Sequence, residues 1–87
     1  MLQKKENEIK KLLRNDGKAQ KAFAQMYAFY QITDKLYQTS HIKLINNIYL
    51  TNKKLFLWQL ADIAHVGESM CFRYRHTYIE CFYLCYD

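Results

Sequence analysis

The chain has 87 residues, which is enough for one hydrophobic core but not for two. Hydrophobic residues make up 51%, charged residues 24%, and proline is absent, which excludes a disordered chain and favours helices over strands. The net charge of +5 favours an anionic partner, while the lack of ~20 consecutive uncharged apolar residues and of a signal-peptide pattern excludes membrane insertion and secretion. We therefore expect one all-α domain over residues 1–87, with four to five helices, in the cytoplasm and without membrane contact.

A basic amphipathic helix is predicted at the N-terminus. Residues 2–14 carry a narrow apolar stripe among alternating charges, which is typical of an exposed helix. Residues 1–22 hold seven Lys or Arg against three Asp or Glu, so most of the excess positive charge lies here. Such a helix could bind phosphate, contact RNA polymerase or keep the domain in solution, and we favour the last role.

A longer core helix is predicted to follow. The triplet Asn15-Asp16-Gly17 combines a helix stop with a cap for the next helix. Residues 18–37 then repeat large side chains often enough for a wide core stripe. The stripe consists of apolar and aromatic residues, namely Ala19, Ala22, Phe23, Met26, Tyr27, Phe29, Tyr30, Leu36 and Tyr37. Its tyrosines could stack on bases, but helical spacing is more typical of core residues.

Two pairs of capping residues divide the middle of the chain. Thr39 and Ser40 precede a helix predicted over residues 41–50. A second capping pair at residues 51–52 precedes a helix predicted over residues 53–65.

The last helix is predicted from Ser69, acting as its cap, to about Cys85. Residues 78–86 are apolar on nearly all sides, which is typical of a helix that packs on both flanks or against another chain. We therefore expect a homodimer surface on this C-terminal aromatic helix.

Residues 60–76, read LADIAHVGESMCFRYRH, have the order of parts of a helix-turn-helix. Leu60, Ala61 and Ala64 share one helix face, and the small alanines allow a second helix to approach closely. Val66 can fill the gap beneath the turn. The residues of the second helix that face the alanines recur every three or four positions, namely Cys71, Tyr74 and Tyr78. Its opposite face is polar and partly cationic, with Glu68, Ser69, Phe72, Arg73 and His76.

Residues 42–82, IKLINNIYLTNKKLFLWQLADIAHVGESMCFRYRHTYIECF, resemble the part of primary sigma factors that reads the promoter −35 element. They are also similar to small regulators of Gram-positive phages and mobile elements, of the autolysin-regulator and late-gene-activator families. The resemblance rests on four matches: the Ile-x-x-Ile-Tyr-Leu helix end from Ile45, the triplet Asn52-Lys53-Lys54, the Leu60-Ala61-x-x-Ala64 helix, and Val66-x-x-Ser69 leading into Phe72-Arg73-Tyr74-Arg75.

This resemblance implies a helix-turn-helix regulator of transcription that binds duplex DNA, near a promoter of phage or mobile-element genes. Such families usually place glycine where this chain has His65, because that turn residue often needs positive φ. Here glycine follows two residues later, at Gly67, which predicts a shifted or differently shaped turn.

The resemblance also implies that six residues face the DNA, namely Gly67, Glu68, Ser69, Phe72, Arg73 and His76. Arg73 could bind a guanine edge, worth roughly 1–3 kcal/mol of discrimination, or a phosphate, which would carry none. Lys53, Lys54 and Arg75 are expected to neutralise backbone phosphates. The alternative for each of these cations is a solvated surface charge.

Cysteine and histidine residues raise the question of a metal site. The thiols are odd in number and lie in an apolar segment, which favours reduced core cysteines over disulfides. The residues concerned are Cys71, Cys81, Cys85, His41, His65 and His76, and they include no CxxC or HxxxH pair. No pattern for nucleophilic catalysis is present either. We therefore expect no metal, no cofactor and no enzymatic activity.

The predicted division of labour follows from these elements. Residues 1–38 are expected to support the fold or contact a partner, and residues 40–85 to form a helix-turn-helix unit that binds double-stranded DNA. The alternative is a helical protein-interaction module that contacts, for example, RNA polymerase and has no DNA binding of its own.

Overall fold

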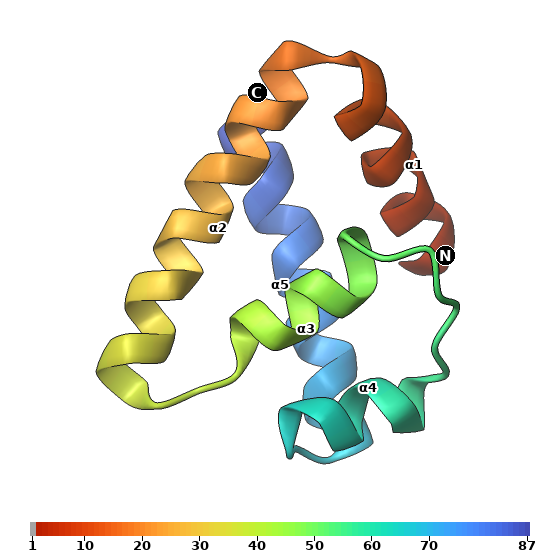
Figure 1. The fold of residues 1–87 in the computed structure, drawn as a ribbon, viewed down its shortest axis with the longest axis vertical. Coiled ribbons are helices and arrows are strands. Elements are labelled where there is room, and N and C mark those ends of the chain that lie inside the picture. The colour runs from red at the N-terminus through yellow and green to blue at the C-terminus, as the bar shows by residue number, and fades with distance from the viewer. Residues whose placement is uncertain (1) are drawn as a thin grey trace.

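The computed structural model describes residues 2–87, which form five α-helices and no strands (Figure 1). The helices are α1 (Leu2–Asn15), α2 (Gly17–Tyr37), α3 (His41–Tyr49), α4 (Leu57–Ala64) and α5 (Glu68–Tyr86). The predicted all-α fold with four to five helices is therefore confirmed. None of the helices in this range is long and apolar enough to span a membrane.

Asp16 starts α2 and also ties the two ends of the fold together. Its Oδ1 atom accepts hydrogen bonds from the backbone amides of Lys18 (2.9 Å) and Ala19 (3.3 Å), as an N-cap should. Its Oδ2 atom accepts a third bond from the Tyr86 hydroxyl, at 2.6 Å. The helix break predicted at Asn15-Asp16-Gly17 is confirmed, and the cap holds the end of α5 beside the start of α2.

The cap of α3 comes from an unexpected residue. Ser40 occupies the N-cap position but makes no capping bond with its side chain. Asp34, in the last turn of α2, accepts instead from the amides of His41 (2.9 Å) and Ile42 (2.8 Å). Because the carboxylate also accepts a bond from the Thr39 hydroxyl, it fixes the whole α2–α3 connection. Ser40 therefore has the predicted N-cap position, but the prediction that the side chains of residues 39–40 cap α3 was wrong.

Helix α4 is shorter than predicted. Residues 53–56 are not helical, and the helix begins at Leu57, after an N-cap at Phe56. The Phe56 amide donates to Gln59 Oε1 at 2.8 Å, so the glutamine side chain satisfies a backbone group that lacks a partner within the helix. The predicted start at Lys53 was wrong: the Thr51 hydroxyl accepts from the Lys53 amide, but the chain stays non-helical until Leu57.

The core is built around α2 and α5, which lie side by side in opposite directions (Figure 1). Buried side chains from all five helices join in one cluster, in which Tyr78 and Phe82 are fully buried. Three residues predicted in the core stripe of α2 are exposed instead, namely Phe29, Leu36 and Tyr37. Phe29 and Leu36 lie with Ile32 on a side of the helix that no described element covers, and Tyr37 is exposed in its last turn.

Helix α5 begins at Glu68, with Gly67 as its N-cap, so the predicted cap at Ser69 was wrong. In its C-terminal half Tyr78 and Phe82 are buried in the core, Tyr83 and Tyr86 pack half-buried against it, and Leu84 is left in solvent, at 81% exposure. The expected homodimer surface on this segment stays a prediction. The three thiols are unpaired, but only Cys71 is buried; Cys81 is half-buried and Cys85 exposed.

Candidate nucleic-acid interface

Helices α4 and α5 pack against each other, and most of the side chains predicted on their inner faces are buried. Ala61 and Ala64 of α4 are buried, as are Cys71 and Tyr78 of α5, and Figure 1 shows α4 lying across the first turns of α5. Val66, in the connection, packs partly buried against the same cluster. The side of α5 away from Cys71 and Tyr78 faces outward.

The three-residue turn keeps its left-handed position at His65. His65 has φ 56° and ψ 43°, whereas Gly67 has an ordinary φ of −69°. The prediction that the glycine shifts the turn is therefore wrong, because the residue with positive φ is the histidine itself. The backbone closes around it through bonds from the His65 amide to the Asp62 carbonyl (3.2 Å) and from the Val66 amide to the Ala61 carbonyl (3.1 Å).

The turn and the first half of α5 present six of the predicted residues to solvent, namely Gly67, Glu68, Ser69, Phe72, Arg73 and His76. Phe72 and His76 pack edge to face, with ring centroids 4.7 Å apart, and form one block on this surface. Arg73 makes no ion pair within residues 2–87. No side chain caps the start of α5, so its first amides remain available to an anion. We call Glu68, Ser69, Phe72, Arg73 and His76 the outward face of α5.

Arg75 does not belong to this surface. Its guanidinium forms two hydrogen bonds to Glu6 of α1, from Nε to Oε2 at 2.9 Å and from Nη2 to Oε1 at 2.5 Å. Both side chains are largely buried, with 13% of Arg75 and 5% of Glu6 exposed. The bond to Glu6 raises the pKa of the guanidinium further. The predicted phosphate contact is therefore corrected: Arg75 is committed to holding α5 against α1.

Lys53 and Lys54 are exposed, but on an extended segment in front of α4 and not on a helix. The amide of Lys53 donates to the Thr51 hydroxyl at 3.2 Å. From α1, the Lys10 ammonium reaches the Thr51 carbonyl at 3.4 Å. The two predicted cations therefore lie opposite the N-terminal helix.

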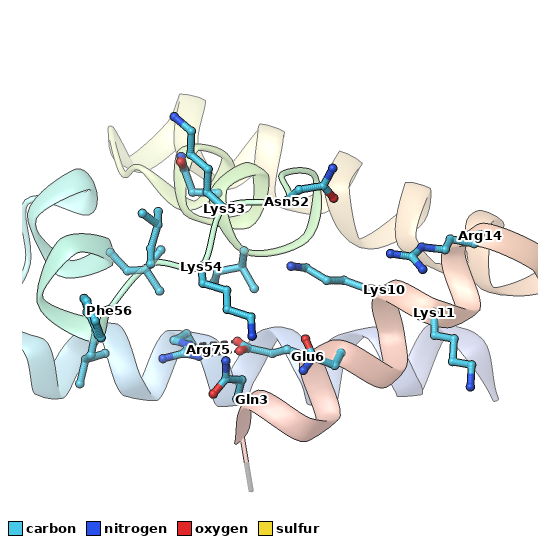
Figure 2. Close-up of a pocket in the computed structure, with 16 residues that line it drawn as sticks. Gln3, Glu6, Lys10, Lys11, Arg14, Asn52, Lys53, Lys54, Phe56 and Arg75 are labelled. Atoms are coloured by element: carbon cyan, nitrogen blue, oxygen red, sulfur yellow. Dashed lines mark hydrogen bonds and ion pairs between the residues drawn. The ribbon is translucent and has the colours of Figure 1, made fainter.

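Between α1 and this segment lies a groove of about 730 Å³, which we call the basic groove (Figure 2). Six cationic residues line it, namely Lys10, Lys11, Arg14, Lys53, Lys54 and Arg75. Glu6 is the one carboxylate among the described residues of its lining, and Arg75 already neutralises it. The chemistry of such a lining is anion binding.

No family model, curated protein or solved structure matches this chain. The similarity of residues 42–82 to sigma-factor and phage regulators therefore stays a prediction that rests on the residues quoted for it. Any function must be argued from the surfaces of the chain itself.

Sequence reasoning located the outward face of α5 but missed the basic groove. The excess of positive charge in α1 and the pair Lys53-Lys54 were the signals for it. They lie some forty residues apart in sequence, and only the packing of α1 against α3 and α5 brings them together.

The buried His41 belongs to the core and to neither of these two surfaces. Its Nδ1 atom is 2.6 Å from the Tyr78 hydroxyl, and the rings of Tyr30 and Tyr74 pack against it. Burial lowers the pKa of the imidazole, which favours its neutral form. Among residues 2–87, no three His, Cys, Asp or Glu side chains are grouped as metal ligands.

Proposed function

We propose that this protein binds duplex DNA and regulates transcription, with the outward face of α5 in a major groove. The observation that carries the proposal is the orientation of α5: Cys71 and Tyr78 are fully buried against the rest of the fold, whereas Arg73 stands exposed on the other side. A recognition helix needs this combination of a rigid inner face and an accessible polar outer face.

Each residue of the surface has a matching role. Arg73 would donate to a guanine edge or a phosphate, and Ser69 would donate to a base or phosphate near the start of the helix. Phe72 is an apolar side chain of the kind that contacts a thymine methyl group. Lys53 and Lys54 would neutralise backbone phosphates, while Arg75 supports the helix through Glu6.

A second function, binding to a protein such as RNA polymerase, is favoured by a different observation. Phe29, Ile32 and Leu36 recur at helical spacing on the uncovered side of α2, and all three are more than half exposed. A contiguous apolar stripe of this kind is typical of a protein contact. The two functions involve different helices, so they can be tested separately.

The test is a titration of the folded protein with a fluorescent mixed-sequence duplex at two salt concentrations. Binding should weaken steeply at the higher concentration, because phosphate contacts release counterions. Arg73→Ala should weaken binding by about tenfold or more and leave the helical circular-dichroism signal unchanged. Lys21→Ala is the matched control, since it also removes one exposed positive charge but lies on α2. Absent or salt-insensitive binding, or an Arg73→Ala protein that binds like the parent, would contradict the proposal.

A further inference from the structure

The lining of the basic groove has more cationic than anionic side chains. Figure 2 shows Lys10 and Arg14 pointing from α1 toward the segment that contains Asn52, while Lys54 points from that segment toward the Glu6–Arg75 pair. Lys11 and Lys53 point away from the interior in the same view. Three cationic side chains thus converge on one hollow from two separate parts of the chain.

The internal ion pair leaves these three charges without a carboxylate. Both oxygens of Glu6 accept from Arg75, so its negative charge is already matched. Lys10 donates to the Thr51 carbonyl, which is neutral. Like charges held together repel one another. An anion in the groove would relieve this repulsion.

The rest of the lining fits an anion with several oxygen atoms. Gln3, Asn7, Asn47 and Asn52 bring amide groups to the same hollow, and amide NH₂ groups donate hydrogen bonds. A volume of about 730 Å³ exceeds what one phosphate group needs. Exposed Phe56 adds an aromatic ring at the α4 end of the groove.

We propose that the basic groove binds phosphate groups, with Lys10, Arg14 and Lys54 as their cationic ligands. The phosphates are those of a free polyphosphate compound or those along a nucleic-acid backbone, since both present the same chemistry to these side chains. The groove lies apart from the outward face of α5 and shares Lys54 with the phosphate contacts proposed above, but binding of a free polyphosphate compound does not depend on that function.

The experiment compares two double variants of equal charge. Arg14→Gln/Lys54→Gln removes two exposed cations that line the groove, whereas Lys4→Gln/Lys5→Gln removes two exposed cations of α1 that do not line it. Each protein is titrated with sodium tripolyphosphate at constant ionic strength, by calorimetry and by thermal melting. The parent should bind and melt at a higher temperature, because a ligand of the folded state stabilises it. The groove variant should bind about tenfold more weakly, and the control within about twofold of the parent.

A parallel titration with duplex DNA identifies the source of the phosphate. If the groove variant loses affinity for both ligands while Arg73→Ala loses it only for the duplex, the groove holds the DNA backbone. If no protein binds the duplex but tripolyphosphate still distinguishes the two double variants, the groove takes a free phosphate compound and only the function proposed above fails. If neither ligand distinguishes the two double variants, the groove is not a phosphate site.

Discussion

Arg73 and Arg75 are two residues apart on α5, but Arg73 is exposed to solvent and Arg75 is largely buried. Arg75 lies largely buried between α5 and α1, where it makes two hydrogen bonds to Glu6. Arg73 lies in solvent on the outward face, with no ion pair inside residues 2–87. The same side chain therefore serves the fold at one position and is available to a ligand at the other. Position on the helix, more than residue type, decides which role an arginine has.

The largest effect that separates the two arginines is on stability. Arg75→Ala leaves the buried Glu6 carboxylate without its partner, which should lower the free energy of unfolding by about 3 kcal/mol. Arg73→Ala should change it by less than about 0.5 kcal/mol, as an exposed substitution usually does. Urea denaturation followed by circular dichroism measures both.

The double variant Glu6→Ala/Arg75→Ala provides the control for this comparison. It removes the stranded charge together with its partner, so part of the lost stability should return relative to Arg75→Ala. Equal stability of the Arg73→Ala and Arg75→Ala proteins would show that the ion pair does not hold α5 against α1.

These two arginines also show how far the sequence could be interpreted. Local patterns were sufficient for the break at Asp16, for the small inner face at Ala61 and Ala64, and for the exposure of Arg73. Each of these depends on neighbours within a few residues, where helical periodicity and capping chemistry apply.

Long-range packing decided the features that the sequence did not reveal. The partner of Arg75 is 69 residues away, so spacing along the chain gave no sign of it. The cap of α3 comes from Asp34 in the preceding helix, and the apolar side of α2 around Leu36 is exposed because no described element covers it. The basic groove depends in the same way on two distant segments meeting.

A titratable group of α3, His41, packs against the inward side of α5, and its protonation should affect stability. His41 Nδ1 and the Tyr78 hydroxyl are 2.6 Å apart, and burial lowers the pKa of His41 although nearby Asp34 opposes this. In the unfolded chain the imidazole titrates near its ordinary 6.5, so below that pH the unfolded state binds more protons than the folded state. Stability should therefore be full above pH 6.5, fall as the pH decreases, and level off below the lowered pKa of the folded protein.

Urea midpoints measured across this pH range for the parent and for His41→Asn test that prediction. Asparagine keeps a polar atom for the Tyr78 hydroxyl but does not titrate, so the variant should lose the part of the slope that lies just below pH 6.5. Identical profiles for the two proteins would mean that another group causes the slope. The neighbouring Tyr30 is not a candidate, because burial raises the pKa of its phenol to about 12.

The smallest expected effect concerns the turn that separates the inward and outward faces of α5 at its start. His65 has a left-handed backbone with φ 56°, which is sterically strained for a residue with a side chain. Gly67 has φ −69° and open space where a Cβ atom would lie. His65→Gly should raise the free energy of unfolding by about 0.5–1 kcal/mol, because glycine adopts positive φ without steric strain. Gly67→Ala should be nearly neutral, since lower chain entropy in the unfolded state offsets a poorer N-cap. Thermal melting of the two variants ranks them, and a larger gain at position 67 than at 65 would show that the turn strain lies elsewhere.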